Sequence, residues 1–327
     1  MPHSCRLAVI SDIHYAGAEE KARCEAFDFR RQIPNYIRRQ MARAAQHHVW
    51  LRQPWAHNYH LDQFLAAAGE PDWVVANGDF SCDTAQIGVQ DPAAFASAAE
   101  GLDKLRRRFG LKLQCVLGDH ELGKPGLFNP GGYMHLGSWE QATGALGIQP
   151  FWQRRCGAYR LAGVTSSLIS LPVLTDDYRP EDGPAWQTLR TVHMNALREL
   201  FESLERGEKV ILFCHDPTAL PLLWEEPVVR GKIDQVELTI VGHLHSPAIF
   251  RLSRCLTGMP PIRFIGQGTR KMTAALNRAR HWKSFRVHLC PSPAGIQLFK
   301  DGGWLEVQLD PAGVRPAQVR PHALPWL

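Results

Sequence analysis

The 327-residue sequence lacks any run of about 18 uncharged apolar residues, so no membrane-spanning helix is predicted. Its eight cysteines never stand at CxxC spacing, which argues against a zinc ribbon or a dithiol redox motif. Several of them, such as Cys115 and Cys214, lie in apolar runs. We therefore expect reduced, partly buried thiols and a reducing compartment. No signal peptide is recognised ahead of the apolar run that begins by Leu7, and a cytoplasmic location is predicted.

Several cofactor and catalytic motifs are also absent. No GxGxxG motif follows a strand-like run and no P-loop occurs, which excludes the usual dinucleotide and nucleotide cradles. The segment GVTSS at 163–167 does not match the GxSxG pattern of a serine nucleophile. The net charge of +5 is small for this length, so it suits an anionic substrate without requiring nucleic acid. The sequence is 45% hydrophobic, which is enough for a sizeable core.

Apolar runs and helical patterns alternate along the chain. Strands are predicted over 6–11, 72–79, 111–119, 209–215 and 237–243. Helices are predicted over 60–69, 91–109 and 185–206. More β structure is expected at 157–171 with a turn at Gly163, at 262–268, at 284–290 and as a hairpin at 296–309, with 311–327 as a trailing arm. This order predicts an α/β fold whose buried sheets are flanked by helices.

Residues 15–58 interrupt that alternation and predict a helical insertion. The segment is rich in basic residues, namely Arg30, Arg31, Arg38, Arg39, Arg43, Arg52, His47, His48 and His57. It also carries large aromatic residues, which are Tyr36, Trp50, Trp55 and the flanking Tyr59. One interpretation is an ordinary amphipathic helix with a solvated basic face. The other is a cap, or an anion-facing wall, beside an active site.

Five short polar blocks carry the chemistry, and each follows an apolar run. They are Asp12-Ile-His14, Gly78-Asp79, Gly118-Asp119-His120-Glu121, His215 and Gly242-His243-Leu244-His245. Ligand sites in open α/β sheets form at the carboxyl ends of the strands, so these blocks are expected to converge. Asp83 and Asp216, which lie near the blocks, are interpreted as ordinary polar neighbours.

The residue types and spacings in these blocks predict a metal site. In extended backbone the outer residues of Asp-x-His and His-x-His point the same way, so each pair can hold one metal. Glycine before a ligand lets the backbone turn where a side chain would block the site. Imidazole with carboxylate and without thiolate suits Mn, Fe or Zn, with manganese favoured here. Magnesium would favour more oxygen ligands.

The ordered series resembles the calcineurin-like metallophosphoesterase superfamily, whose pattern is D-x-H, G-D, G-N-H-[DE], H and G-H-x-H. The match spans residues 7–268. The resemblance implies a four-layer α/β/β/α sandwich of two mixed sheets. It implies a catalytic domain over 1–290, with the insertion at about 15–58 as its cap, and a C-terminal β-hairpin and tail over 291–327 packed on the same domain.

The resemblance also implies a role for each matching residue. Asp12, His14 and His245 would bind one of two divalent metals, Asp79 would bridge both, and Asp119, His215 and His243 would bind the other. A metal-bridging hydroxide would be the nucleophile. His120 would lie near the scissile phosphate, where it stabilises charge or protonates the leaving oxygen. Glu121 would fix an imidazole orientation from outside the ligand set.

One residue departs from the family pattern. Position 119 is usually asparagine and here is aspartate, which keeps a metal-binding oxygen but loses an NH₂ donor. With two divalent cations, three aspartates and a hydroxide, the centre would be neutral rather than singly positive. We expect a preference for diesters or pyrophosphate-linked substrates over dianionic monoesters. Two alternatives are that aspartate merely replaces asparagine as a ligand, and that the site has little activity.

Three further functions are compatible with the same motifs. The first is a metal-binding scaffold with weak turnover, and the second is a nuclease, although no nucleic-acid recognition motif is present. The third is a lipid pyrophosphohydrolase of the UDP-diacylglucosamine type at the inner membrane face, with the basic, aromatic insertion in peripheral contact with the membrane. The expected partner is a phosphate-containing small molecule or lipid-linked substrate.

Overall fold

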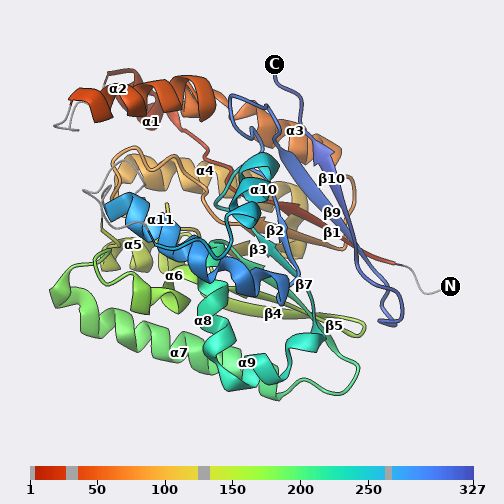
Figure 1. Ribbon diagram of the computed structural model, residues 1–327. Helices are drawn as coiled ribbons and strands as arrows, with labels where there is room; N and C mark the ends of the chain where they lie inside the picture. The colour runs from red at the N-terminus through yellow and green to blue at the C-terminus, as the bar shows by residue number, and fades with distance from the viewer. Residues whose placement is uncertain (1–3, 27–35, 124–132, 262–266) are drawn as a thin grey trace.

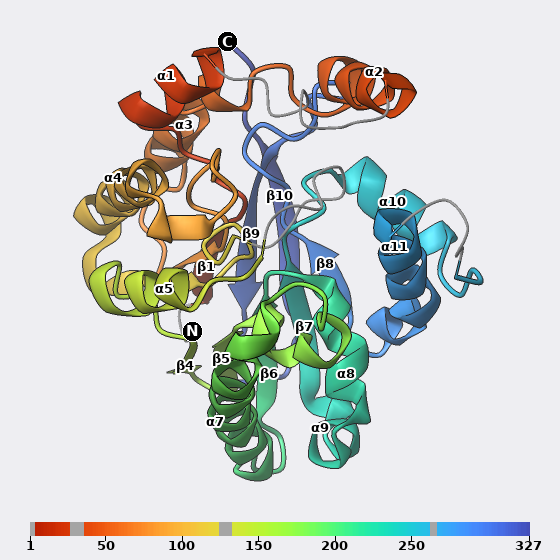
Figure 2. The ribbon, with the colours of Figure 1, turned by 90° about the vertical axis from the view of Figure 1, so that its left-hand side faces the viewer.

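The computed structural model describes residues 4–26, 36–123, 133–261 and 267–327. Two five-stranded sheets pack face to face, and helices cover the outer side of each sheet (Figure 1, Figure 2). Three apolar clusters fill the spaces, one between the sheets and one under each helical layer. The predicted four-layer α/β/β/α sandwich of two mixed sheets is confirmed.

The first sheet carries the N-terminal strand at its centre. Its order is β10 (Gln318–Ala323), β9 (Gly303–Leu309), β1 (Cys5–Ile10), β2 (Trp73–Asn77) and β3 (Leu113–Val116). β1, β2 and β3 are parallel, whereas β9 is antiparallel to β1 and to β10. In β1, Leu7 and Val9 point between the sheets while Ala8 and Ile10 point to the helices. Both faces are buried, which explains why the strand is continuously apolar.

The second sheet has the order β4 (Phe151–Cys156), β5 (Tyr159–Val164), β6 (Lys209–Cys214), β7 (Val236–Val241) and β8 (Val287–Leu289). Only β4 is antiparallel to its neighbour. Ile211 and Phe213 of β6 pack against the first sheet, while Val210 and Leu212 pack against helices. The parallel strands therefore have their carboxyl ends along one edge.

The helices divide between the two outer layers. Those on the first sheet include α1 (Ala18–Ala26), α3 (Tyr59–Ala67), α4 (Pro92–Phe109) and α5 (Leu136–Glu140). Those on the second are α6 (Ser166–Ile169), α7 (Gly183–Glu202), α8 (Leu220–Glu225), α9 (Pro227–Gly231), α10 (Pro247–Cys255) and α11 (Gln267–Arg278). Within the described ranges, none of the helices combines the length and apolarity needed to cross a bilayer.

The longest helix of the first layer shows how local sequence sets a boundary. Asp91 precedes α4, and its carboxylate accepts a hydrogen bond from the Ala94 N–H at 2.9 Å, while Pro92 occupies the first helical position. The same carboxylate receives two hydrogen bonds from the Arg23 guanidinium of α1, at 2.8 and 2.9 Å. Asp91 therefore begins one helix and anchors the first helix of the insertion.

Three predictions of β structure and the prediction of a trailing arm need correction. Gly163 lies inside β5, and the turn before that strand is at 157–158, because Trp152 of β4 packs over Gly163 and needs a residue without a side chain there. The second strand expected within 157–171 is wrong, since residues 166–169 form α6. Residues 267–268 begin α11 instead of ending a strand, and 262–266 lie outside the described residues. The hairpin predicted at 296–309 is wrong, since 297–299 form a turn without a strand before it and β9 pairs with β10. The expected trailing arm therefore contributes an edge strand.

The helical character predicted for residues 15–58 is confirmed where the structure describes them. α1 is followed by α2 (Tyr36–Ala44), the short helical segment η2 (Ala45–Val49) and η3 (Pro54–Ala56). Arg30 and Arg31 lie outside the described residues. α2 stands beyond both helical layers, at the end of the molecule opposite α7 (Figure 1, Figure 2).

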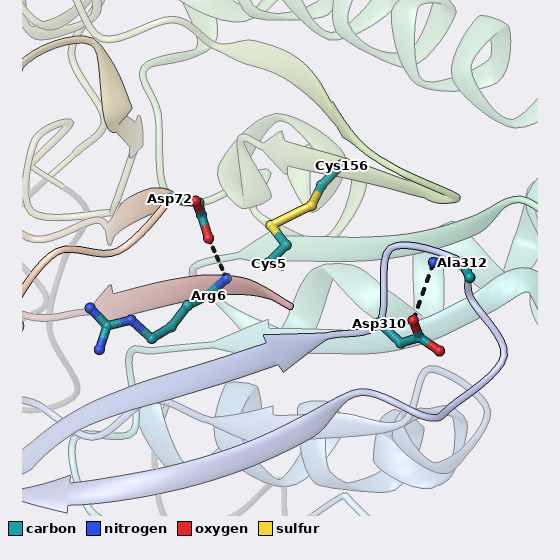
Figure 3. Close-up of a disulfide and its surroundings, with 6 residues drawn as sticks. All are labelled: Cys5, Arg6, Asp72, Cys156, Asp310 and Ala312. Carbon is teal, nitrogen blue, oxygen red and sulfur yellow. Dashed lines mark hydrogen bonds between the residues drawn. A yellow bond between two sulfur atoms is a disulfide. The ribbon is translucent and has the colours of Figure 1, made fainter. Parts of the chain in front are cut away.

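One disulfide joins the two sheets. Cys5 at the start of β1 is bonded to Cys156 at the end of β4 (Figure 3). The expectation that the cysteines are all reduced is therefore wrong for this pair, which no sequence spacing indicated. Beside it, the Arg6 N–H donates to the Asp72 carboxylate at 2.8 Å, which ties β1 to the segment before β2 (Figure 3). The Ala312 N–H likewise donates to Asp310 in the turn after β9.

Replacing Gly163 by alanine tests the packing between β4 and β5. A Cβ at this position would lie 2.2 Å from Trp152 Cε2, and the indole cannot easily move because its N–H donates to the Cys115 carbonyl at 2.8 Å. We expect Gly163→Ala to lower the free energy of unfolding by about 1–3 kcal/mol. Denaturant unfolding measures this.

Gly144→Ala is the matched control, since a Cβ there meets nothing within 4 Å. It lies in a short helical segment, so alanine should be neutral or stabilising by up to about 1 kcal/mol. Equal stability of the Gly163→Ala protein and the wild type would contradict the packing argument.

Candidate metal centre

The five predicted blocks lie together at one edge of the sandwich. Asp12 follows β1, Asp79 follows β2 and Asp119 follows β3, all from the first sheet. His215 follows β6, and His243 and His245 follow β7 of the second sheet. The packed sheets bring these carboxyl ends face to face, so the predicted convergence is confirmed.

The convergent side chains form two clusters with one member in common. The first contains Asp12, His14, Asp79 and His245, and the second contains Asp79, Asp119, His215 and His243. In each cluster one potential ligand atom per residue lies within 4.8 Å of all the others. These are the seven positions predicted to bind metal.

Short distances within the clusters show how closely these atoms gather. The Nε2 atoms of His14 and His245 are 3.3 Å apart in the first cluster. In the second, Asp119 Oδ1 lies 3.0 Å from both His215 Nε2 and His243 Nδ1. Two adjacent metal-sized sites that share the Asp79 carboxylate can therefore form here.

The backbone reaches this arrangement differently from the expected extended pairs. Five of the seven residues have positive φ, with values of 52° for Asp12, 45° for His14, 58° for Asp79, 65° for His243 and 58° for His245. Such conformations are uncommon outside glycine and are retained where the surroundings impose them. The period-two argument is therefore wrong, and left-handed turns aim these side chains into the site.

Two glycines allow the loops to approach each other. A Cβ on Gly118 would lie 2.1 Å from Asp79 Oδ1, and one on Gly242 would lie 2.0 Å from Ser11 Oγ and 2.6 Å from Asp12 Oδ2. Neither site has room for a methyl group. The glycines that precede ligands therefore allow neighbouring loops to approach each other closely, as the sequence predicted. A side chain at either position would collide with the carboxylate of a neighbouring loop.

Hydrogen bonds to main-chain carbonyls orient two of the imidazoles. His215 Nδ1 lies 2.7 Å from the Asn77 carbonyl oxygen, and His14 Nδ1 lies 3.2 Å from that of Ser81. A proton on Nδ1 leaves Nε2 with its lone pair directed into the cluster, which is the tautomer a metal requires. The Asp12 carboxylate accepts the His243 N–H at 2.9 Å and so links the two sheets.

Glu121 supports the loops instead of an imidazole, which corrects the expected role. Its carboxylate is fully buried and accepts backbone N–H groups from Asp79 at 3.0 Å, Phe80 at 2.7 Å and Gly118 at 2.9 Å. Even so, burial raises the pKa of Glu121 to about 7. Asp83 and Asp216 also accept backbone N–H groups, as expected of ordinary polar neighbours.

The electrostatics of the clusters fit a pair of cations. Asp79 Oδ2 is buried without a hydrogen-bond partner and lies 3.1 Å from His215 Nε2 and 3.9 Å from His14 Nε2. Burial raises the pKa of Asp12 to about 6 and lowers the pKa of His14 to about 4. Burial also opposes the charge of Asp79, but His215 outweighs it and the pKa of Asp79 is lowered. A buried carboxylate oxygen between imidazoles of both clusters is a suitable bridging ligand.

His120 lies beside the clusters and belongs to neither. Its ring stands edge-on to that of His14, with 4.7 Å between the ring centroids, and its Nδ1 is buried without a hydrogen-bond partner. Burial favours the neutral ring, but Asp79, Asp119 and other carboxylates raise the pKa of His120 to about 9. The imidazole of His120 therefore lies against His14 among carboxylates that favour its protonated form.

The sequence placed Trp50 in the insertion but did not single it out as a neighbour of the clusters. Trp50, which follows η2 of the insertion, places its ring against His245, with 4.7 Å between the ring centroids. The Leu298 N–H donates to the Val49 carbonyl at 3.2 Å, and the Gln297 N–H donates to that of Trp50. No motif spacing relates Trp50 to the strand ends, so only the folded chain reveals the contact.

Two clusters of imidazole and carboxylate that share one aspartate define a binuclear divalent metal centre. The family model for calcineurin-like phosphoesterase matches residues 5–247, and the chain belongs to this family. The protein is therefore a metal-dependent phosphoesterase, that is, a hydrolase. A sequence search among curated proteins finds no match.

Among solved structures, the similarities are distant. A dimetal phosphatase from Danio rerio is 12% identical with a TM-score of 0.47, covering 93% of this chain and 92% of its own. Phosphopantetheinyl hydrolase from Mycobacterium tuberculosis is 16% identical with a TM-score of 0.38, over 75% and 84% of the two chains. A purple acid phosphatase from yellow lupin is 12% identical with a TM-score of 0.38, and the match covers 75% of this chain and 38% of the phosphatase.

Changing Glu121 to glutamine tests its support of the loops. A glutamine has only one acceptor oxygen for three N–H donors, and its own NH₂ would face one of them. We expect Glu121→Gln to cost about 1–3 kcal/mol of stability and to weaken metal binding about 10–100-fold. Thermal unfolding and metal titration measure the two effects.

Glu306→Gln is the control, because Glu306 is also buried but lies in the middle of β9, where it contacts Arg6. Its metal affinity should equal that of the wild type. If both variants bind metal equally well, Glu121 does not support the centre.

Proposed function

We propose that the protein hydrolyses a phosphate diester or a pyrophosphate-linked substrate at two divalent cations, with manganese favoured over iron and zinc. The single observation behind the choice of a diester or pyrophosphate substrate is Asp119 in the second cluster. Its Oδ1 lies 3.0 Å from His215 Nε2 and from His243 Nδ1. One cation would be bound by Asp12, His14 and His245. The other would be bound by Asp119, His215 and His243, and Asp79 would bind both.

The residues of the chain position the reaction. When bound, the cations would acidify a shared water and neutralise charge on the phosphoryl oxygens. Backbone turns at the strand ends and the hydrogen bonds of Glu121 fix the ligand atoms before substrate arrives. His120, outside both clusters but against His14, holds a proton for the leaving oxygen.

Charge supports the diester or pyrophosphate preference. Two divalent cations carry four positive charges, and three aspartates in the clusters offset three of them. With asparagine at 119 only two would be offset. The present site therefore attracts a dianionic monoester less strongly than a site with asparagine would. A diester group carries one negative charge, so its electrostatic attraction to the site decreases less. Asp119 also offers no NH₂ donor for a phosphoryl oxygen.

A substrate panel with Asp119→Asn tests the proposal. We expect purified protein to retain transition metal and to hydrolyse diester or pyrophosphate substrates faster than monoesters, with chelation abolishing turnover. We expect Asp119→Asn to raise the ratio of monoester to diester kcat/KM by about tenfold, because one more positive charge remains.

Metal quantification of both proteins is the control, since the asparagine oxygen still binds metal. An unchanged ratio with full metal content would refute the charge argument. Turnover of none of the substrates by metal-loaded protein would favour the scaffold function instead.

His120→Gln tests the proton-donor role. Glutamine keeps a polar side chain of similar reach but cannot transfer a proton at neutral pH. We expect kcat to fall about 10²–10⁴-fold while bound metal is unchanged. Substrates with a leaving group that needs no protonation, such as p-nitrophenolate, should lose much less. Equal losses for good and poor leaving groups would show that His120 acts by another means.

A further inference from the structure

Exposed apolar side chains gather on the insertion and on the loop that holds it. We define the apolar rim as Tyr36, Ile37, Met41, Val49, Trp50, Leu298 and Phe299. These are seven of the sixteen large apolar side chains that stand exposed among the described residues. On α2, Tyr36 and Ile37 are 68% exposed and Met41 is 65% exposed. Exposed apolar side chains that recur within two connected segments indicate an interaction site.

The segment that bears most of this rim has charge of one sign. The sequence has no aspartate or glutamate between Asp28 and Asp62. The side chains that the structure describes in that stretch include three arginines, at positions 39, 43 and 52. Lys300 follows the rim residue Phe299 in the adjoining loop. Exposed apolar residues interspersed with arginine are complementary to a surface that is both apolar and anionic.

The rim is continuous with the metal centre. α2 leads directly into η2, which ends at Val49, and Trp50 lies against His245. Hydrogen bonds from Gln297 and Leu298 join the loop at 296–300 to the same two insertion residues. A surface bound at the rim therefore lies beside His245 of the first cluster.

The observations favour a lipid surface over two other occupants. A second copy of the chain would bring one arginine-rich segment against another in a two-fold dimer, where like charges repel. Single-stranded nucleic acid is bound by several aromatic side chains that stack on successive bases. The three most exposed side chains of the rim are Tyr36, Ile37 and Met41, of which only one is aromatic, and Trp50 already packs against His245. Aliphatic side chains with arginine fit acyl chains and anionic headgroups.

We propose that the apolar rim docks the protein on an anionic lipid surface, with the metal centre facing that surface. Ile37 and Met41 enter the headgroup boundary, and the arginines of the insertion contact phosphate. Docking does not depend on turnover, so it is separable from the proposed function. If the proposed function also holds, the substrate reaches the centre from the lipid side, as an amphiphile with a phosphodiester or pyrophosphate group.

Vesicle co-sedimentation of the full chain tests the docking. Wild-type protein should bind phosphatidylglycerol–phosphatidylcholine vesicles and bind phosphatidylcholine vesicles at least about tenfold more weakly. Ile37→Glu with Met41→Glu should weaken binding to the anionic vesicles by about tenfold or more, because two apolar contacts are lost and two negative charges are added. Added salt should weaken the binding of the wild type.

Val192→Glu with Val314→Glu is the matched control. These valines are 66% and 82% exposed, on α7 and in the connection between β9 and β10, away from the rim. This variant should bind like the wild type. Turnover of a soluble diester should be unchanged in both double variants, which shows that they fold.

Three results would overturn the proposal. One is wild-type binding that does not distinguish anionic from zwitterionic vesicles. Another is equal vesicle binding by the two double variants. The third is gel filtration showing that Ile37→Glu with Met41→Glu converts a dimer to a monomer, which would assign the rim to self-association. If the wild type does not hydrolyse the soluble diester at all, that result would instead count against the proposed function alone.

Discussion

The whole site depends on one buried carboxylate, that of Asp79, which belongs to both clusters. Its Oδ2 has no hydrogen-bond partner and faces imidazoles from each sheet. Its Oδ1 accepts a hydrogen bond from the main-chain N–H of His120 at 3.0 Å, which fixes the plane of the carboxylate. A buried anion of this kind is costly unless cations or donors compensate it. The surrounding loops can therefore be understood as the means of holding this group in place until cations bind.

The loops achieve this through backbone conformation and a second carboxylate. Positive φ at five of the seven ligand positions turns those side chains inward after their strands. Glu121 then ties the loop after β2 to the loop after β3 by accepting their N–H groups. Because strained backbone is concentrated at the centre, the stability must come from the three apolar clusters that surround the sheets.

Much of this arrangement could be predicted from the sequence, for a definable reason. Apolar runs followed by Asp12, Asp79, Asp119, His215 and His243 fix both the strands and the edge where they end. The positive φ of Asp12, Asp79 and His243 could not be predicted, because aspartate and histidine rarely adopt this conformation without tertiary constraint. The partners of Glu121 are main-chain donors, which have no sequence signature.

Long-range pairings were the other features hidden from the sequence. The Cys5–Cys156 bond joins residues 151 positions apart, and no spacing rule links them. β10 was hidden because its residues are mostly exposed and include Pro321, as is common on an edge strand. The contact of Trp50 with His245 likewise depends on how the insertion folds back onto a C-terminal loop.

That C-terminal loop couples segments that are remote in sequence. Asp301 accepts the Ser246 hydroxyl at 2.6 Å and the Ile296 N–H at 3.4 Å, and the Ser292 N–H donates to the His245 carbonyl at 2.9 Å. The insertion rests on the same loop through Gln297 and Leu298. The insertion and residues 292–301 therefore depend on each other for their hydrogen bonds. A chimaera that exchanged either segment between relatives without the other would disturb the loop beside His245.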